Sequence, residues 1–245
     1  MQNFRPSINT IPPVVKNLII INVIMLFITF VMNLKGIDLN NILGLHYIGS
    51  PEFKPYQLVT HMFMHGGLMH LAFNMFALWM FGRVLESVWG PKRFFIFYFV
   101  TGLGAAVFYS FVNYIEFQYI AAKLSPETVQ MVMNSGAELL NQGQNYVDSP
   151  GKLNLILNTP TVGASGAVFG ILLGFGMLFP NTQLMLLFPP IPIKAKYFVM
   201  GYGAIELFSG ITGMGGNIAH FAHLGGMLFG FIMIKYWNST TRNFY

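Results

Sequence analysis

The chain has 245 residues, of which 54% are hydrophobic and only 9% are charged. Soluble domains carry about a quarter charged residues, so this composition excludes an ordinary soluble protein and indicates one that is solvated by lipid. The sequence holds no cysteine, which excludes disulfides, iron–sulfur clusters and thiol catalysis.

Long apolar segments recur along the chain. A membrane-spanning helix needs about 20 consecutive, mainly apolar residues. Six segments reach or approach this length, at about 14–34, 57–81, 91–113, 161–179, 196–212 and 217–237. The first begins around Lys16 and precedes no small-residue cleavage site, so we interpret it as a retained anchor. The sequence therefore predicts an all-α polytopic membrane protein, a bundle of six transmembrane helices.

Basic residues are distributed unequally between the two sides that six spans define. Nine lie on the side of the termini: Arg5, Lys16, Arg83, Lys92, Arg93, Lys194, Lys196, Lys235 and Arg242. Four lie on the opposite side: Lys35, Lys54, Lys123 and Lys152. Because cytoplasmic loops are enriched in Lys and Arg, we expect both termini in the cytoplasm. The compact six-span form favours a bacterial inner membrane.

One connection is much longer than the others. We treat about 114–160 as an insertion in an outer loop of a single domain, 1–245. Within it, residues 125–140 begin with Ser-Pro-Glu and predict a short helix. The apolar residues at helical spacing are Val129, Val132 and Met133. This face suits the membrane surface or the helical bundle, and a solvated loop is the alternative.

Histidines are concentrated in two predicted spans, although ionisable side chains in lipid usually face a cavity or a partner. The second span holds His61, His65, His70 and Asn74, and the sixth holds His220 and His223. Hydrogen bonds to loops or helix ends explain His61 and His65. His70 and His223 stand beside further unusual features.

The first such feature is residues 163–166, Gly-Ala-Ser-Gly. They follow residues 159–161, Thr-Pro-Thr, which predict a helix start. Ser165 is then expected one turn into the helix, about 7 Å below its start. A stripe of small residues follows: Gly166, Gly170 and Gly174. Such a stripe permits close helix packing, and Ser165 as a mere packing residue is the structural alternative.

The second feature is the pair Gly226 and Gly230 after His223, which offers a matching smooth face. If the two glycine faces pack together, Ser165 and His223 lie at similar depth near the outer leaflet. Ser165 follows Pro160 by five residues, and His223 follows Asn217 by six. A histidine that contacts a serine hydroxyl can take its proton and make it a nucleophile.

The third feature is His70 and Asn74, which are four residues apart and share one helix face. Acyl transfer builds negative charge on a carbonyl oxygen, and preorganised donors stabilise it. An imidazole N–H, an asparagine amide and the backbone N–H of Ser165 suit that role.

Together these residues resemble the rhomboid family of intramembrane serine proteases, over the second to the sixth span. The motifs that carry the resemblance are Gly163-x-Ser165-Gly166, His70-x-x-x-Asn74, and Ala222-His223-x-x-Gly226-x-x-x-Gly230. A further pattern, Gly82-x-x-x-Glu86, is similar to the family's motif at the cytoplasmic end of the second span.

The resemblance implies a role for each residue. Ser165 is the nucleophile, and His223 is the general base and then the acid that protonates the leaving amine. His70 and Asn74 are oxyanion-hole donors. The family uses a Ser-His dyad without an acid, and we expect no carboxylate near either motif. Glu206 is assigned to the fifth span, which the family uses as a mobile substrate gate.

Two further points follow from the resemblance. His65 is similar to a structural histidine that ties down the first outer loop. Phe169 stands where the family often has a tyrosine that packs on the catalytic histidine, so the ring is kept and its hydroxyl is lost. The first outer loop also lacks a Trp-Arg pair that some members have.

We therefore expect an intramembrane serine endopeptidase that cleaves transmembrane segments of membrane-protein substrates within the lipid bilayer. We expect no cofactor, no metal and no nucleic-acid partner, and the sequence does not define the oligomeric state. One alternative is a catalytically inactive rhomboid-like binder of membrane proteins. Others are a histidine-based proton relay and a metal site formed by His61, His65, His70 and His223.

Overall fold

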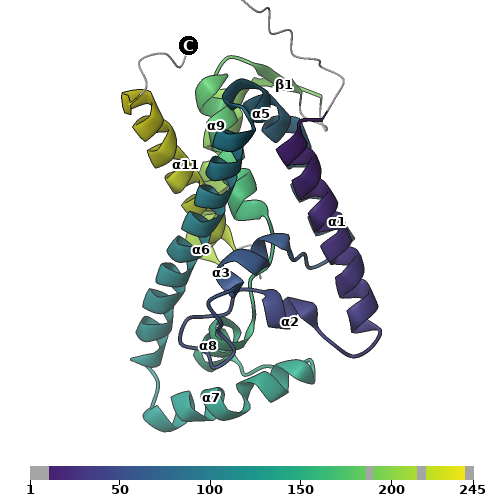
Figure 1. Ribbon diagram of the computed structural model, residues 1–245. Coiled ribbons are helices and arrows are strands. Elements are labelled where there is room, and N and C mark those ends of the chain that lie inside the picture. The colour runs from purple at the N-terminus through teal and green to yellow at the C-terminus, as the bar shows by residue number, and fades with distance from the viewer. Residues whose placement is uncertain (1–10, 186–189, 214–218, 241–245) are drawn as a thin grey trace, which may run out of the picture.

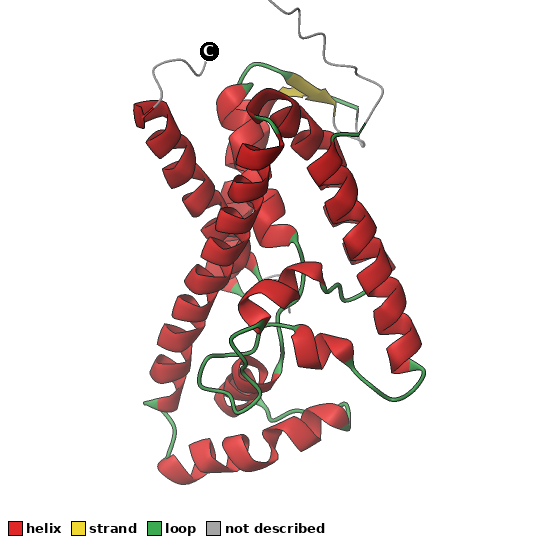
Figure 2. Cartoon of the chain, viewed as in Figure 1, coloured by secondary structure: helices red, strands yellow, loops and turns green. Residues whose placement is uncertain are grey.

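The computed structural model describes residues 11–185, 190–213 and 219–240, and nearly all of its regular structure is helical (Figure 2). The elements are α1 (Pro13–Asn33), α2 (Leu39–Leu43), α3 (Gln57–Thr60), η1 (His61–Phe63), α4 (Leu68–Ala77), η2 (Leu78–Gly82), α5 (Arg83–Trp89), α6 (Pro91–Ala121), α7 (Pro126–Asn141), α8 (Asp148–Asn158), α9 (Ser165–Leu178), β1 (Gln183–Met185), β2 (Pro192–Lys194), α10 (Ala195–Thr212) and α11 (His220–Thr240). Strands β1 and β2 pair antiparallel, with Leu184 opposite Ile193.

Three helices in the described part of the chain are long and apolar enough to cross a membrane. They are α1, the helical run Leu68–Trp89 that α4, η2 and α5 form, and α6. Large apolar side chains on α1, such as Phe27 and Phe30, are exposed, as lipid-facing residues are. The prediction of a helical membrane protein is confirmed, whereas the count of six spans stays a prediction.

The second predicted span, 57–81, was placed too early. Its helix runs over Leu68–Trp89, and α3 and η1 precede it as short separate turns. Polar side chains of α3 explain the difference, because they bond to the first outer loop. Thr60 Oγ1 donates to the Leu43 carbonyl at 2.6 Å, and Gln57 Nε2 donates to the Ile42 carbonyl at 3.2 Å.

The other boundaries agree with the sequence to different degrees. Helices α1 and α10 begin and end within one residue of the predicted spans. Helix α6 continues to Ala121, beyond the predicted end at 113. Helix α9 begins at Ser165 instead of 161, and α11 begins at His220. Asn217, from which the depth of His223 was counted, lies outside the described residues.

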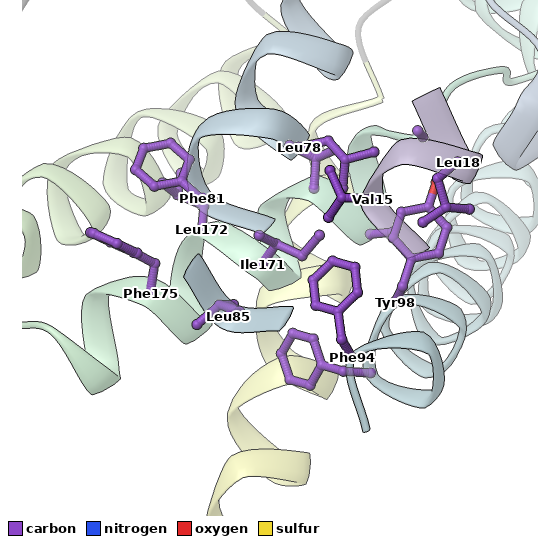
Figure 3. Packing of buried hydrophobic residues seen from close by; sticks show 14 of the residues in the cluster. Val15, Leu18, Leu78, Phe81, Leu85, Phe94, Tyr98, Ile171, Leu172 and Phe175 are labelled. Carbon is purple, nitrogen blue, oxygen red and sulfur yellow. The ribbon is translucent and has the colours of Figure 1, made fainter. Parts of the chain in front are cut away.

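Helix α9 lies at the centre of the bundle and packs against α4, α5, α6, α10 and α11. Nine of its 14 residues are buried. Figure 3 shows Ile171 and Phe175 of α9 among side chains from other helices, including Leu78, Leu85 and Phe94. Other helices therefore pack around α9 on several sides, which fixes the position of Ser165, its first residue.

Glycines set the distance between α9 and α11. A β-carbon on Gly226 would overlap the carbonyl oxygen of Gly166, and one on Gly230 would lie 3.3 Å from the Gly170 Cα. The predicted contact between the two glycine faces is confirmed at these positions. Gly174 instead faces Leu85 of α5 and side chains beside it.

The long outer loop is folded. The predicted helix is confirmed as α7, and the Ser125 hydroxyl caps it by accepting from the Thr128 N–H. Its buried Val132 packs with Ile120 and Leu153 in a small second core. Helix α8, which supplies Leu153, was not predicted. Figure 1 shows α7 and α8 at one end of the molecule and α5 and β1 at the other.

At that other end, Glu86 joins α5 to the beginning of α1. Its two carboxylate oxygens accept from the backbone N–H groups of Val14 and Val15, at 2.9 and 2.8 Å. The first N–H groups of a helix lack partners within the helix, and a carboxylate there also suits the helix dipole. Glu86 thus anchors α1 to the span that carries His70 and Asn74.

Candidate active site

Ser165 is the first residue of α9, not a residue one turn inside it. The preceding chain stays extended because it is hydrogen-bonded to other segments. Thr161 exchanges two backbone hydrogen bonds with Leu45, and the Gly163 N–H donates to the His61 carbonyl at 2.9 Å. This local structure leaves Ser165 at a helix N-terminus, where backbone N–H groups point out of the helix and favour negative charge.

His223 contacts Ser165 directly. The distance from His223 Nε2 to Ser165 Oγ is 2.9 Å, which is hydrogen-bond distance. His223 lies on α11 one turn after its start, and only 9% of its surface is exposed. The close approach of α9 and α11 at Gly166 and Gly226 is what allows this contact.

Phe169 holds the His223 ring from one side. The two rings are stacked, with centroids 4.1 Å apart and an interplanar angle of 5°. Phe169 lies one turn after Ser165 on the same helix, so one helix supplies both the hydroxyl and the stacking surface. Loss of the tyrosine hydroxyl does not prevent this packing, because the stack uses only the face of the ring.

His70 faces the same space as Ser165. A β-carbon on Gly163 would lie 2.9 Å from His70 Nε2 and 3.6 Å from Ser165 Oγ. Gly163 also has φ +133°, a backbone conformation that favours glycine. Two reasons therefore favour glycine at 163: its backbone conformation, and the His70 ring that a β-carbon would meet.

Asn74 lies one turn further along α4 and is buried. Its Nδ2 donates to the His70 carbonyl at 3.0 Å, which uses one of the two N–H donors of the amide. The structure thus brings three of the four predicted site residues, Ser165, His223 and His70, to one place, and puts Asn74 on the adjoining helical turn.

The expectation that no carboxylate lies near the motifs is wrong. Glu206 Oε2 lies 3.0 Å from His223 Nδ1 and 2.6 Å from His220 Nδ1. Sequence distance concealed this contact, because Glu206 is on α10 and the histidines are on α11. One signal was present in the sequence: Glu206 is the acid deepest within a predicted span, and such a group needs a partner.

His61 and His65 have structural surroundings. His61 Nδ1 donates to the Gln57 carbonyl at 2.8 Å. The His65 carbonyl accepts from Asn40 Nδ2 in the first outer loop at 3.4 Å. His65 therefore ties that loop down through its backbone rather than through its ring, and the ring lies edge-on to the His70 ring.

A metal site is not formed by the histidines that the sequence suggested. In the portion of the chain that the structure describes, the one group of three or more such side chains close enough to share an ion is Glu206, His220 and His223. Of the four histidines predicted for such a site, it contains only His223.

Comparison with known proteins agrees with this fold. Residues 52–238 match the model of the Rhomboid domain. This match covers well over half of the chain, so the protein belongs to the rhomboid family and is an integral membrane protein.

Three relatives show the range of similarity. The chain is 32% identical over 173 residues to RHOMBOID-like protein 12, mitochondrial, of Arabidopsis thaliana, which covers 70% of this chain and 43% of that protein. It is 27% identical over 176 residues to Rhomboid protease AarA of Providencia stuartii, which covers 69% and 51%. It is 23% identical over 232 residues to Putative rhomboid protease YdcA of Bacillus subtilis, which covers 95% and 92%. The matches with the first two span about half the length of those relatives.

Proposed function

We propose that the protein is an intramembrane serine endopeptidase that hydrolyses peptide bonds in transmembrane segments of membrane-protein substrates. The observation that carries the proposal is the 2.9 Å contact between Ser165 Oγ and His223 Nε2. A serine hydroxyl is a weak nucleophile until a base in contact with it takes its proton. The name of the AarA relative, a rhomboid protease, supports the same activity.

The reaction proceeds in two halves. His223 Nε2 takes the Ser165 proton while Oγ attacks the scissile carbonyl carbon, and then gives that proton to the leaving amine nitrogen as the peptide bond breaks. Water next loses a proton to Nε2 and attacks the acyl-enzyme, and the proton returns to Ser165 Oγ as the ester bond breaks. The stacked Phe169 ring keeps the imidazole in one plane through both halves.

Three donors stabilise the oxyanion in this proposal. They are the Ser165 backbone N–H at the beginning of α9, the imidazole of His70 and the second amide N–H of Asn74. Their support is the helix N-terminus at Ser165, the His70 ring beside Gly163 and the position of Asn74 on the next turn. Fixed donors in a site of low dielectric constant contribute a few kcal/mol each.

A serine-directed phosphonate probe tests the proposal. We expect the purified protein to be labelled and to cleave a transmembrane model substrate, and we expect Ser165→Ala to lose both properties. Ser239→Ala is the matched control, because it removes an exposed hydroxyl near the other end of α11. Equal labelling of the wild type and Ser165→Ala would exclude Ser165 as the nucleophile.

We also propose that residues 1–245 form a single domain with six spans in a bacterial inner membrane. Both termini lie on the cytoplasmic side in this proposal. The excess of basic residues on one side supports this topology. Because the chain has no cysteine, single cysteines report it directly. A membrane-impermeant maleimide is expected to label Asn134→Cys in whole cells but to label Lys196→Cys only after the membrane is opened. The reverse pattern would invert the topology.

A further inference from the structure

We infer that Glu206 is a positioning residue for His223, so that the site works as a Ser165–His223–Glu206 triad instead of a two-residue dyad. The inference rests on the proposed function and adds to it a side chain from a third helix, α10.

The two nitrogens of the His223 ring face different partners. Nε2 lies 2.9 Å from Ser165 Oγ, and Nδ1 lies 3.0 Å from Glu206 Oε2. The carboxylate is within ion-pair distance, although it is off the line of a good hydrogen bond from Nδ1. Catalytic hydrogen bonds are often poorly aligned before substrate binds and tighten in the complex with substrate, so the present alignment does not exclude a catalytic contact.

The carboxylate selects the tautomer that the proposed reaction needs. A neutral imidazole has one nitrogen that donates and one that accepts. For Nε2 to accept the Ser165 proton, the ring hydrogen must reside on Nδ1. A carboxylate only accepts, so Glu206 beside Nδ1 favours that form.

Glu206 also stabilises the charge that forms during the reaction. When Nε2 takes the Ser165 proton, the ring becomes an imidazolium whose Nδ1–H faces a negative carboxylate. The proton then leaves from Nε2 to the amine, while the Nδ1 hydrogen remains in place. Glu206 thus stays a carboxylate throughout and exchanges no proton.

The placement of Glu206 on α10 supports a specific role. Three of the 18 residues of α10 are buried, and they are Ala195, Val199 and Glu206. Its neighbours Ile205 and Leu207 are exposed, as lipid-facing residues are. The second half of α10 therefore buries one side chain, and that side chain is an acid turned toward α11.

His220 offers a competing explanation. It lies 2.6 Å from the same carboxylate oxygen, so Glu206 would also hold α10 against α11 if it had no part in the reaction. The titratable groups near this carboxylate include His220 and His223 on α11 and, beyond His223, His70 on α4. Variants that break the two contacts separately distinguish the two roles.

The experiment compares four variants of the full chain in proteoliposomes with a fluorogenic transmembrane substrate. Glu206→Gln keeps the shape of the side chain and removes its charge. Glu206→Asp keeps the charge. His220→Gln replaces the second imidazole beside the carboxylate with an uncharged amide. Thr212→Val is the matched control, because it removes an exposed polar group from the same helix.

We expect Glu206→Gln to lower kcat roughly 10- to 1,000-fold with KM and the melting temperature nearly unchanged. This loss is smaller than the ~10⁴-fold effect of the comparable Asp-to-Asn change in a chymotrypsin-type triad. The aspartate of that triad contacts one histidine, whereas the Glu206 carboxylate is shared between His223 and His220. Glu206→Asp is expected to keep more of kcat than Glu206→Gln, and His220→Gln to change the melting temperature more than kcat.

Two results would overturn the inference. One is a Glu206→Gln variant with wild-type kcat. The other is an equal fall in kcat in Glu206→Gln and His220→Gln, with an equal loss of melting temperature in both variants. If Glu206→Gln does not fold, Glu206→Asp decides. Its shorter side chain keeps the charge but moves the carboxylate away from His223 Nδ1, so the triad predicts a kcat below that of the wild type at an unchanged melting temperature. A wild-type kcat for Glu206→Asp would then contradict the triad. A wild type without phosphonate labelling or cleavage removes the proposed function, and the triad with it.

Discussion

Two buried glutamates lie far apart in this fold and have different partners. Glu86 of α5 lies beside the beginning of α1, and each of its carboxylate oxygens accepts from one backbone N–H. Glu206 of α10 lies beside the beginning of α11, and one of its oxygens contacts two imidazole rings. Their exposed fractions are similar, 2% and 7%. Burial alone therefore does not separate a structural acid from one that serves a reaction.

The partners make that separation. A backbone N–H cannot change its protonation state, so the contact of Glu86 with α1 contributes only to stability. An imidazole changes its charge during the proposed reaction, so the contact of Glu206 with His223 contributes to each proton transfer. The comparison predicts that substitutions near Glu206 alter rates and that substitutions near Glu86 alter stability.

The strongest test of the predicted effect on rates is His223→Ala. We expect cleavage to fall at least about 10⁴-fold, because the base that activates Ser165 is absent. The melting temperature should change little compared with this loss. Residual cleavage at a tenth of the wild-type rate would separate His223 from the chemistry and end the contrast between the two acids.

Gly226→Ala tests whether the spacing of α9 and α11 controls the rate. The added methyl group meets the carbonyl of Gly166, so the helices must separate and Ser165 moves away from His223. We expect kcat to fall by roughly 10²-fold, as for a misplacement of about 1 Å, and stability to fall by about 1–3 kcal/mol.

Gly201→Ala is the matched control for that variant, because a β-carbon at 201 has no neighbour within 4 Å. Single-turnover cleavage and thermal unfolding measure the two effects. Equal rates for the two alanine variants would show that the close helix approach does not position the serine and the histidine.

Asn74→Ala tests whether the proposed oxyanion donors affect the rate of cleavage. We expect cleavage to slow by a factor of roughly 10 to 1,000, because loss of one oxyanion donor typically costs about 10²–10³ in rate. Asn134→Ala on the exposed face of α7 is the control and should cleave at the wild-type rate. Initial rates at saturating substrate measure the effect, and an unchanged rate in Asn74→Ala removes this residue from the site.

Glu86→Gln is expected to have the smallest effect on catalysis. The amide has one oxygen where the carboxylate has two, so one N–H at the beginning of α1 loses its acceptor and the charge is lost as well. We expect stability to fall by about 1–3 kcal/mol and kcat to stay unchanged at temperatures where the protein is folded.

Thermal unfolding and kcat are measured on the same preparation, with Glu116→Gln, an exposed acid on α6, as the control. The informative pairing is with Glu206→Gln. A large fall in kcat for Glu86→Gln at full folding would make the two glutamates equivalent and remove the distinction that their partners suggest.

The sequence by itself determined the membrane class and the family resemblance, and it predicted the candidate site residues Ser165, His223 and His70. Each depends on local composition or on short spacings, such as a glycine four residues after another. Helix periodicity turns such spacings into faces, so the packing of Gly166 against Gly226 was predictable.

The tertiary structure decided where α9 begins and which acid meets the histidine. The extended segment before Ser165 exists because Thr161 pairs with Leu45 and Gly163 bonds to His61, contacts between residues distant in the chain. Glu206 reaches His223 from another helix, at a distance that no spacing within one helix encodes. Local patterns fix which face a side chain occupies, whereas only the packed helices fix what that face meets.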